Sequence, residues 1–299
     1  MNKEYKAIIL GANGYIGSHL SLYLSNQGWN IYNYDIQPDS SFDNYKQIDI
    51  KDSEQLLKTD FNVDYVFLFS GITGTSSGFN NYKSFIDINE VGLLNVLNIL
   101  SQHHNKPRVV YPSTRLVYKG GELPLKEDDE KEAKSIYAIN KLACENYLKL
   151  YNNVFNIHYS IFRICVPYGN FFSSKYSYGT IGSFIEKATS GNPITLYGDG
   201  SLKRTYTYIE DICRQIEKCI LCPSSVNEIF NIGGETFSLK EVAQRIASLY
   251  NVEVDTVAWP DMDLKIESGH TFFDDTKIKT AIGDIFYTNL LDLNWIQNG

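Results

Sequence analysis

The sequence predicts an α/β fold, in which a doubly wound parallel sheet carries a second, smaller α/β lobe that binds substrate. The chain opens with an apolar strand, a glycine turn and a helix. Strand and helix patterns then alternate at the spacing of crossover connections between parallel strands. Segment 64–69 is apolar almost throughout, as a strand covered on both faces should be.

The elements follow one another in chain order and indicate two lobes. The predicted strands are 5–10, 30–35, 45–50, 64–69, 108–111, 156–164 and 228–232, and the predicted helices are 15–26, 52–58, 79–102, 135–151, 181–190, 209–220 and 238–250. Asp52 caps one helix, and Ser238 with Glu241 forms a capping box on another. We expect residues 1–166 plus 206–234 to form the larger lobe, and 167–205 plus 235–299 to close over its strand ends.

Composition excludes several classes of function. The chain has 299 residues, of which 43% are hydrophobic and 21% charged, typical of a globular enzyme. Its net charge of −8 argues against nucleic acid as a partner. No apolar run approaches the roughly 20 residues that span a bilayer. Because the N-terminus leads straight into a strand, we expect no signal peptide, no membrane insertion and a cytoplasmic protein.

The cysteines do not indicate a metal or redox site. They are scattered and odd in number, which is typical of reduced thiols. Cys219 and Cys222 have the spacing of a CxxC motif, but no histidine cluster accompanies them. We therefore expect buried thiols and no bound metal.

The first turn of the fold has the features of a phosphate-binding loop. Gly11 allows a sharp turn after the strand, Gly14 allows a pyrophosphate to approach the backbone, and Gly17 allows the helix to pack on the strand. The helix N-terminus adds free N–H groups and a positive dipole end. Asp35 ends the next strand, about 20 residues further on, where a carboxylate accepts hydrogen bonds from an adenosine ribose. Its charge would repel a 2′-phosphate, so NAD is favoured over NADP.

A second set of residues predicts acid–base chemistry. Tyr137 and Lys141 stand four residues apart on one helix face. A nearby ammonium should lower the pKa of the phenol towards working pH. The phenol could then exchange a proton with a sugar or alcohol hydroxyl while hydride moves to or from nicotinamide. Ser113 and Thr114 end a strand, where a hydroxyl can hydrogen-bond the reacting oxygen.

Together these motifs, in this order, resemble the extended short-chain dehydrogenases/reductases, within the nucleotide-sugar epimerase/dehydratase family (UDP-glucose 4-epimerase-like). The resemblance covers nearly the whole chain. It is carried by 11–17, 113–118, 137–141, 163–169, 197–204 and 230–234. It implies a Rossmann domain that binds NAD, a nucleotide-diphosphate sugar as substrate, and a homodimer joined through the helices near 80–102 and 135–151.

The resemblance also implies roles for individual residues. Thr114, Tyr137 and Lys141 would be catalytic. Cofactor binding would involve Gly11, Asn13, Gly14, Tyr15, Ile16, Gly17, Asp35, Ile36, Asp49, Ile50, Phe69, Ser70, Gly71, Asn89, Tyr137, Lys141 and Ile164. Substrate binding would involve Thr73, Thr114, Val166 and Arg204, with Arg204 on the diphosphate.

Three features of the sequence depart from the family pattern. Arg115 and Leu116 stand where family dehydratases carry Asp-Glu, so we expect no 4,6-dehydratase activity. Val166 replaces an asparagine that touches the substrate phosphates. A late arginine is missing near 267–274, where Lys265 and His270 are the local cationic candidates.

The sequence therefore favours an NAD-dependent nucleotide-sugar epimerase, acting at C4 by transient hydride transfer, in the synthesis of sugar nucleotides and surface polysaccharides. Two alternatives stay open. One is an NAD(P)H-dependent reductase of a 4-keto-6-deoxy nucleotide sugar. The other is a non-catalytic NAD(P)-binding regulatory protein, because a fold alone does not prove chemistry.

Overall fold

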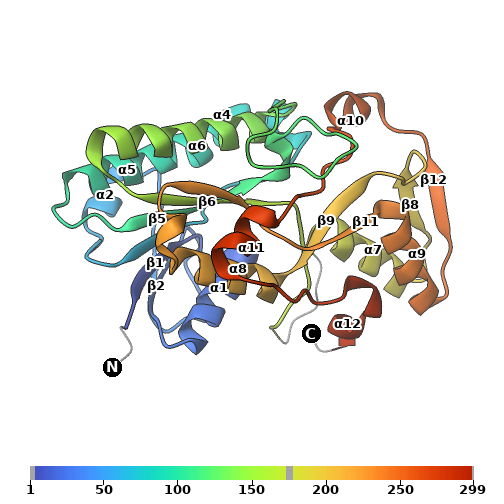
Figure 1. Ribbon diagram of the computed structural model, residues 1–299, viewed down its shortest axis with the longest axis horizontal. Helices are drawn as coiled ribbons and strands as arrows, with labels where there is room; N and C mark the ends of the chain where they lie inside the picture. Colours follow the sequence, from blue (N-terminus) through green and yellow to red (C-terminus); the bar gives the residue numbers. More distant parts are fainter. Residues whose placement is uncertain (1–3, 173–177, 298–299) are drawn as a thin grey trace.

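The computed structural model describes residues 4–172 and 178–297, which form a larger and a smaller lobe (Figure 1). Residues 173–177, part of the expected smaller lobe, lie outside the described residues, as do both ends of the chain. The larger lobe contains the main sheet, and the smaller one lies beside it with helices α7 (Gly179–Thr189) and α9 (Leu239–Tyr250).

A seven-stranded sheet forms the larger lobe, and every strand pair in it is parallel. In order across the sheet the strands are β10 (Glu228–Asn231), β6 (Tyr159–Ile164), β5 (Arg108–Thr114), β4 (Tyr65–Leu68), β1 (Lys6–Leu10), β2 (Asn30–Asp35) and β3 (Tyr45–Gln47). The order reverses between β1 and β4, and ligands bind at the carboxyl ends of the strands beside such a reversal. The predicted doubly wound fold is confirmed.

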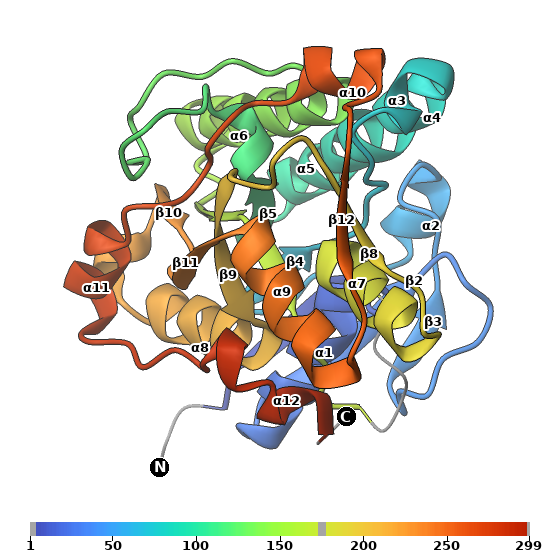
Figure 2. The same cartoon turned by 90° about the vertical axis from the view of Figure 1, so that its right-hand side faces the viewer.

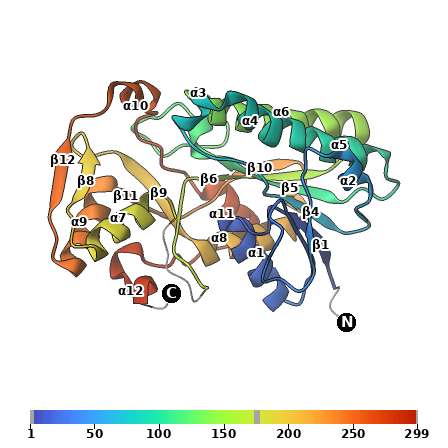
Figure 3. The ribbon, with the colours of Figure 1, turned by 180° about the vertical axis from the view of Figure 1, so that it is seen from behind.

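Helices cover both faces of this sheet, as Figure 3 shows from behind. One core lies under α2 (Ser53–Leu57), α5 (Gly92–Gln102) and α6 (Ile136–Phe155). The other lies under α1 (Tyr15–Asn26), α8 (Ile209–Ile220) and α11 (Thr276–Ile282). The central strands are buried on both sides for this reason, and all four residues of β4 are buried.

The helix predicted over 79–102 is not one regular helix. Its first turn is a separate α3 (Ser77–Asn80), which ends where Asn81 leaves helical geometry at φ −124° and ψ 27°. Next come α4 (Tyr82–Ile86), a π-helical turn over Asp87–Val91, and α5. A π turn inserts one extra residue into a helix, which hydrophobic periodicity does not reveal.

Helix α6 continues to Phe155, past its predicted end at residue 151. Asn156 ends it in the left-handed region at φ 55°, a conformation that asparagine tolerates better than most residues. The following strand therefore begins at Tyr159 and not at residue 156.

The smaller lobe combines two short sheets with helices, seen end-on in Figure 2. One sheet consists of β11 (Glu235–Ser238), β9 (Lys203–Tyr208) and β7 (Val166–Tyr168), and the other of β12 (Val254–Val257) and β8 (Ile194–Tyr197). Short helices α10 (Asp261–Ile266) and α12 (Asn294–Gln297) complete it. The predicted capping box is present: Ser238 Oγ accepts from Glu241 N, and Glu241 Oε2 accepts from Ser238 N.

One part of the expected smaller lobe packs elsewhere. Ile278 of α11 is fully buried in the core of the larger lobe, beside residues of α8 and β10 such as Ile209 and Phe230. The assignment of all of 235–299 to the smaller lobe is therefore corrected for α11. The chain packs on the main sheet at α11, and α12 then joins the smaller lobe again. Trp295 of α12 is buried in the core of the smaller lobe.

A buried ion pair joins the elements that carry the predicted site. Arg163 on β6 donates to both carboxylate oxygens of Glu145 on α6, at 2.9 and 2.6 Å. Ser113 on β5 donates to the same carboxylate at 2.5 Å. Arg163 also donates to Tyr118 Oη at 2.7 Å and to Glu127 O at 2.8 Å. The side chains of Arg163 and Glu145 are only 2% and 0% exposed, so each charge depends on the other.

We expect Glu145→Gln to lower the free energy of unfolding by about 3–5 kcal/mol, because it leaves the Arg163 guanidinium buried without its counter-charge. Urea denaturation followed by circular dichroism measures the change. Glu228→Gln is the matched control: it breaks an exposed pair with Lys277 and should cost less than about 1 kcal/mol. Equal losses in the two variants would contradict the structural role of Glu145.

Candidate dinucleotide and substrate site

The glycine turn lies where β1 passes into α1, and two of its glycines are required by close contacts. Gly11 has φ 93°, and a Cβ there would lie 2.4 Å from Ser70 N at the end of β4. A Cβ on Gly17 would lie 2.0 Å from Gly11 O. The strand, the turn and the helix can pack this closely only with glycine at both positions.

The N-terminus of α1 is available to an anion. Gly14 is the N-cap residue and has no side chain with which to satisfy the first N–H groups of the helix. No acidic side chain lies in the first turn. These N–H groups and the helix dipole fit a pyrophosphate.

Asp35 ends β2 directly beside the turn. Its Oδ2 accepts from Asn13 N at 3.0 Å, and its Oδ1 accepts from Gln37 N at 3.3 Å. A negative charge thus lies within hydrogen-bond distance of the phosphate-binding backbone. This position fits an adenosine ribose and opposes a 2′-phosphate, as the sequence indicated.

Three other residues predicted to bind the cofactor, Asn89, Ile50 and Asp49, contact neighbouring segments of the protein, and a fourth, Ile36, is exposed. Asn89, on the π turn, accepts from Ile72 N at 2.9 Å and donates to Ile72 O at 3.0 Å, so its amide holds the loop after β4. Ile50 is buried against Gly92 of α5. Asp49 caps the backbone at Lys51. The Ile36 side chain is 56% exposed beyond the end of β2.

The catalytic candidates and the glycine turn line one cavity of about 230 Å³, which we call the cofactor cavity. Of the predicted residues it is lined by Gly14, Tyr15, Ile16, Gly17, Phe69, Gly71, Thr73, Thr114, Tyr137, Lys141 and Ile164. Residues from four strand ends and two helices therefore meet at the carboxyl edge of the sheet.

The geometry of Tyr137 and Lys141 follows from the start of α6. Ser135 caps this helix by accepting from Ala138 N at 3.2 Å, which places Tyr137 in the first turn and Lys141 one turn later. Lys141 Nζ donates to Pro112 O at 2.7 Å and lies 4.4 Å from the Tyr111 ring centroid. It lies 5.8 Å from the Tyr137 ring centroid.

The expected lowering of the Tyr137 pKa does not result from the protein groups alone. Withdrawal of the phenol from water raises its pKa well above the usual range, and Tyr178 adds to this, while a hydrogen bond with Thr114 acts in the opposite direction. Burial lowers the pKa of Lys141 to about 8, and the nearby Glu145 carboxylate raises it. Near neutral pH Lys141 therefore still carries a positive charge, although burial opposes it.

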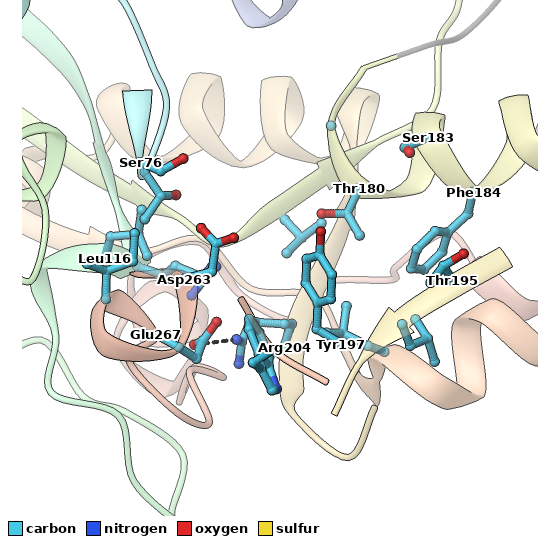
Figure 4. Close-up of a pocket in the computed structure, with 18 residues that line it drawn as sticks. Ser76, Leu116, Thr180, Ser183, Phe184, Thr195, Tyr197, Arg204, Asp263 and Glu267 are labelled. Carbon is cyan, nitrogen blue, oxygen red and sulfur yellow. Dashed lines mark hydrogen bonds and ion pairs between the residues drawn. The ribbon is translucent and has the colours of Figure 1, made fainter. Parts of the chain in front are cut away.

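A second cavity of about 530 Å³, which we call the substrate cavity, lies between the two lobes and is lined by residues of both (Figure 4). Thr180, Phe184 and Tyr197 line it from α7 and β8, and Asp263 lines it from α10. Two residues predicted to bind substrate, Val166 and Arg204, belong to it. Further lining residues include Thr75, Ser76, Arg115, Leu116, Ser183, Thr195, Trp259 and Glu267.

At two places consecutive residues of the chain line one cavity each. Thr114 lines the cofactor cavity, and the next residue, Arg115, lines the substrate cavity. The same change occurs between Cys165 and Val166. A molecule that occupied the substrate cavity could therefore place one end beside the Tyr137 hydroxyl.

Arg204 is not a solvated surface charge, because it is only 2% exposed. Its guanidinium donates to Glu267 Oε1 at 2.8 Å, to Lys203 O at 2.8 Å and to Gly269 O at 2.6 Å (Figure 4). The pKa of Arg204 is lowered to about 10, mainly by burial and also by the neighbouring charge of Arg115. The Glu267 carboxylate acts in the opposite direction.

Two residues of the site were not predicted from the sequence as ligand-binding residues. Arg115 was noted only as a departure from the dehydratase pattern, whereas Lys265 and His270, the expected cations, do not line the substrate cavity. Tyr178 lines the cofactor cavity and stacks on Tyr15 with ring centroids 4.0 Å apart. Its neighbours in sequence give no periodic pattern that could have identified it.

Within 4–172 and 178–297 no group of three or more His, Cys, Asp or Glu residues could hold a metal ion. All five cysteines are free, with Cys219 buried on α8 and Cys222 donating to Ala281 O. No described helix combines the length and apolar character needed to cross a membrane.

Comparison with known proteins identifies related chains. Residues 7–233 match the model of the NAD dependent epimerase/dehydratase family. A putative UDP-glucose 4-epimerase of Methanocaldococcus jannaschii is 28% identical over 79% of this chain and 79% of its own length. UDP-glucuronate 4-epimerase 1 of Arabidopsis thaliana is 28% identical over 69% of this chain and 53% of its own length. The Bacillus cereus UDP-glucuronic acid 4-epimerase, crystallised with UDP-glucuronic acid and NAD, has a TM-score of 0.83 at 22% identity over 98% and 99% of the two chains.

We expect Asp35→Ala to weaken NAD binding by about 10- to 100-fold, because a charged hydrogen-bond acceptor for the ribose is lost. Isothermal titration calorimetry measures the affinity. Asp35→Asn retains an acceptor for Asn13 N but removes the charge, so this variant should gain affinity for NADP relative to NAD. Asp39→Ala, on the exposed loop nearby, is the control. Unchanged NAD affinity and unchanged discrimination in both Asp35 variants would refute the ribose assignment.

Proposed function

Since this chain belongs to the NAD-dependent epimerase/dehydratase family, we propose that it is a nucleotide-sugar epimerase that inverts C4 of its sugar. One observation carries the proposal. Thr114, Tyr137 and Lys141 line the cofactor cavity, and Arg115, the residue after Thr114, lines the substrate cavity. A sugar held by its nucleotide in the smaller lobe would therefore meet a proton-transfer group and a hydride acceptor at the same place.

The cofactor of the family is NAD, and the residues of this chain fit it. The first turn of α1 would hold the pyrophosphate and Asp35 the adenosine ribose. NAD bound there would supply the acceptor for the C4 hydride and its donor on return to the opposite face, so the overall reaction would have no net redox change. Its oxidised ring also carries a positive charge, which favours the phenolate form of a neighbouring tyrosine.

Tyr137 would act as the acid and base. Its phenolate takes the proton of the C4 hydroxyl as hydride leaves, and the phenol gives the proton back as hydride returns. Lys141 contributes a second positive charge, 5.8 Å from the Tyr137 ring centroid, and a positive charge near a phenol favours its phenolate form. Thr114, already hydrogen-bonded to Tyr137, would donate to or accept from the reacting oxygen.

The substrate cavity would bind the nucleotide diphosphate. Arg204 lies on its wall and would hold the diphosphate, with Glu267 fixing the orientation of its guanidinium. The Val166 side chain has no polar group, so the contacts to the diphosphate would differ from those in family members that carry asparagine at this position. A 4,6-dehydratase reaction is not proposed, because Arg115 and Leu116 provide no acid or base beside Thr114.

We also propose a homodimer through the outer face of α4 and α6. Apolar side chains are exposed there: Tyr82 and Ile86 on α4 are 49% and 39% exposed, and Ile139, Leu150 and Val154 on α6 are 50%, 54% and 59% exposed. The two helices pack side by side on the larger lobe (Figure 1). Burial of this surface against a second copy of the chain would remove it from water.

Incubation of the purified protein with UDP-, dTDP-, GDP- and CDP-sugars, followed by NMR of the products, tests the proposed activity. We expect a C4 epimer to form without added NAD(P)H, whereas a ketoreductase would consume NAD(P)H stoichiometrically. Tyr137→Phe should reduce kcat by about 100-fold or more, since the phenol is the acid–base group. The variant should keep its NAD affinity.

Tyr147→Phe is a suitable control, because its hydroxyl bonds to Glu90 on the outer side of α6 and does not line either cavity. Full turnover in Tyr137→Phe would refute the mechanism. Failure of the wild-type protein to convert any of these sugars, with NAD bound, would favour a regulatory role.

Sedimentation equilibrium tests the dimer. Leu150→Asp should convert a dimer to single chains, because it places a charge in the centre of the proposed apolar contact. Leu57→Asp, on the exposed surface of α2, is the control and should leave the mass unchanged. A wild-type protein that sediments as a single chain at micromolar concentration would contradict this proposal.

A further inference from the structure

Arg115 is a cation in the substrate cavity without an anionic partner in the structure. It is half-buried, and its Nη1 donates to Thr271 Oγ1 at 2.8 Å. No carboxylate in the described segments lies within ion-pair distance of it. Asp263 lines the same cavity but makes no ion pair with it. A guanidinium has five N–H donors, so most of those on Arg115 are free to bind a ligand.

Arg204 is the contrasting case. Three of its hydrogen bonds go to Glu267 Oε1, Lys203 O and Gly269 O, and Glu267 balances its charge. Burying a positive charge without a counter-charge is unfavourable, which makes the Arg115 end of the cavity the place where an anion gains most. Thr271, which is fully buried, holds the Arg115 side chain in position for it.

The position of Arg115 in the chain indicates which part of a substrate it meets. It directly follows Thr114, whose side chain lines the cofactor cavity beside Tyr137. Arg115 therefore lies on the side of the substrate cavity next to Thr114, and Tyr197 and Trp259, an aromatic pair 5.3 Å apart, line the same cavity. Arg204 lies near Arg115 and is the residue that we assign to the diphosphate, so a further anionic group that Arg115 binds would belong to the sugar.

We propose that Arg115 binds the carboxylate of a nucleotide-linked hexuronic acid and makes this enzyme selective for uronates over neutral hexoses. A planar carboxylate matches the two parallel N–H groups of a guanidinium. The inference rests on the proposed function, because it names the sugar class at the same site. Arg115 acts on specificity and takes no part in the proton or hydride transfer.

The test compares UDP-glucuronate with UDP-glucose in steady-state kinetics and in calorimetric binding to the NAD-loaded protein. The wild type should prefer UDP-glucuronate. Arg115→Gln should lower kcat/KM for UDP-glucuronate by about 10- to 100-fold, the effect of losing one charge-assisted contact, and leave UDP-glucose within about 2-fold. Arg115→Lys should give an intermediate kcat/KM for UDP-glucuronate, because lysine keeps the positive charge but lacks the two parallel N–H groups of a guanidinium.

Two controls separate this role from others. Lys119→Gln removes one exposed positive charge four residues away and should change neither sugar. Plain UDP is the third ligand: its affinity should be the same in wild type and Arg115→Gln, since UDP has the diphosphate but no sugar. The melting temperature of Arg115→Gln shows whether the variant is folded.

Three results would overturn the inference. These are a wild type that favours or equals UDP-glucose, a wild type that binds neither sugar nucleotide, and an Arg115→Gln variant that loses UDP, UDP-glucose and UDP-glucuronate equally. The last result would assign Arg115 to the diphosphate. The proposed epimerase function fails separately, through full turnover in Tyr137→Phe.

Discussion

The buried pair between Glu145 and Arg163 is the interaction on which the site depends. Glu145 lies one turn after Lys141 on α6, and Arg163 directly precedes Ile164 on β6. The same carboxylate accepts from Ser113, the residue before Thr114. One ion pair thus fixes the relative positions of three elements that each contribute a wall of the cofactor cavity. Because both charges are out of water, neither can be lost without a large cost.

Charge in this protein acts locally. The chain has a net charge of −8, which would repel a nucleotide diphosphate at long range. Positive potential is instead supplied locally, by the N-terminus of α1, by Lys141, by Arg204 beside Glu267 and by Arg115 beside Thr271. Each lies in or next to a cavity where water screens it less than at the surface. Binding of an anionic ligand there depends on short contacts and not on the overall field.

The acid–base site shows two opposing physical effects. Burial would exclude water from the proposed reaction and also raises the pKa of Tyr137, the group that we propose gives up a proton. Lys141 places a positive charge 5.8 Å from the Tyr137 ring centroid, but its ammonium is itself destabilised by burial and donates to Pro112 O. The tyrosine is thus poised for catalysis only with further positive charge near it, which links its proton transfer to occupation of the cofactor cavity.

Local rules of the sequence determined most of the fold and located the residues of the proposed cofactor site. Gly11, Gly17 and Asp35 could be placed because strand, turn and helix are adjacent in the chain, and α1, β2 and α8 have the predicted bounds. Tertiary structure alone decided the rest. The π turn at Asn89 and the packing of α11 against the larger lobe depend on contacts far apart in sequence. Arg115 illustrates the same limit, since its pairing with Thr271 and its lack of a carboxylate partner depend on how distant segments meet, which no local pattern encodes.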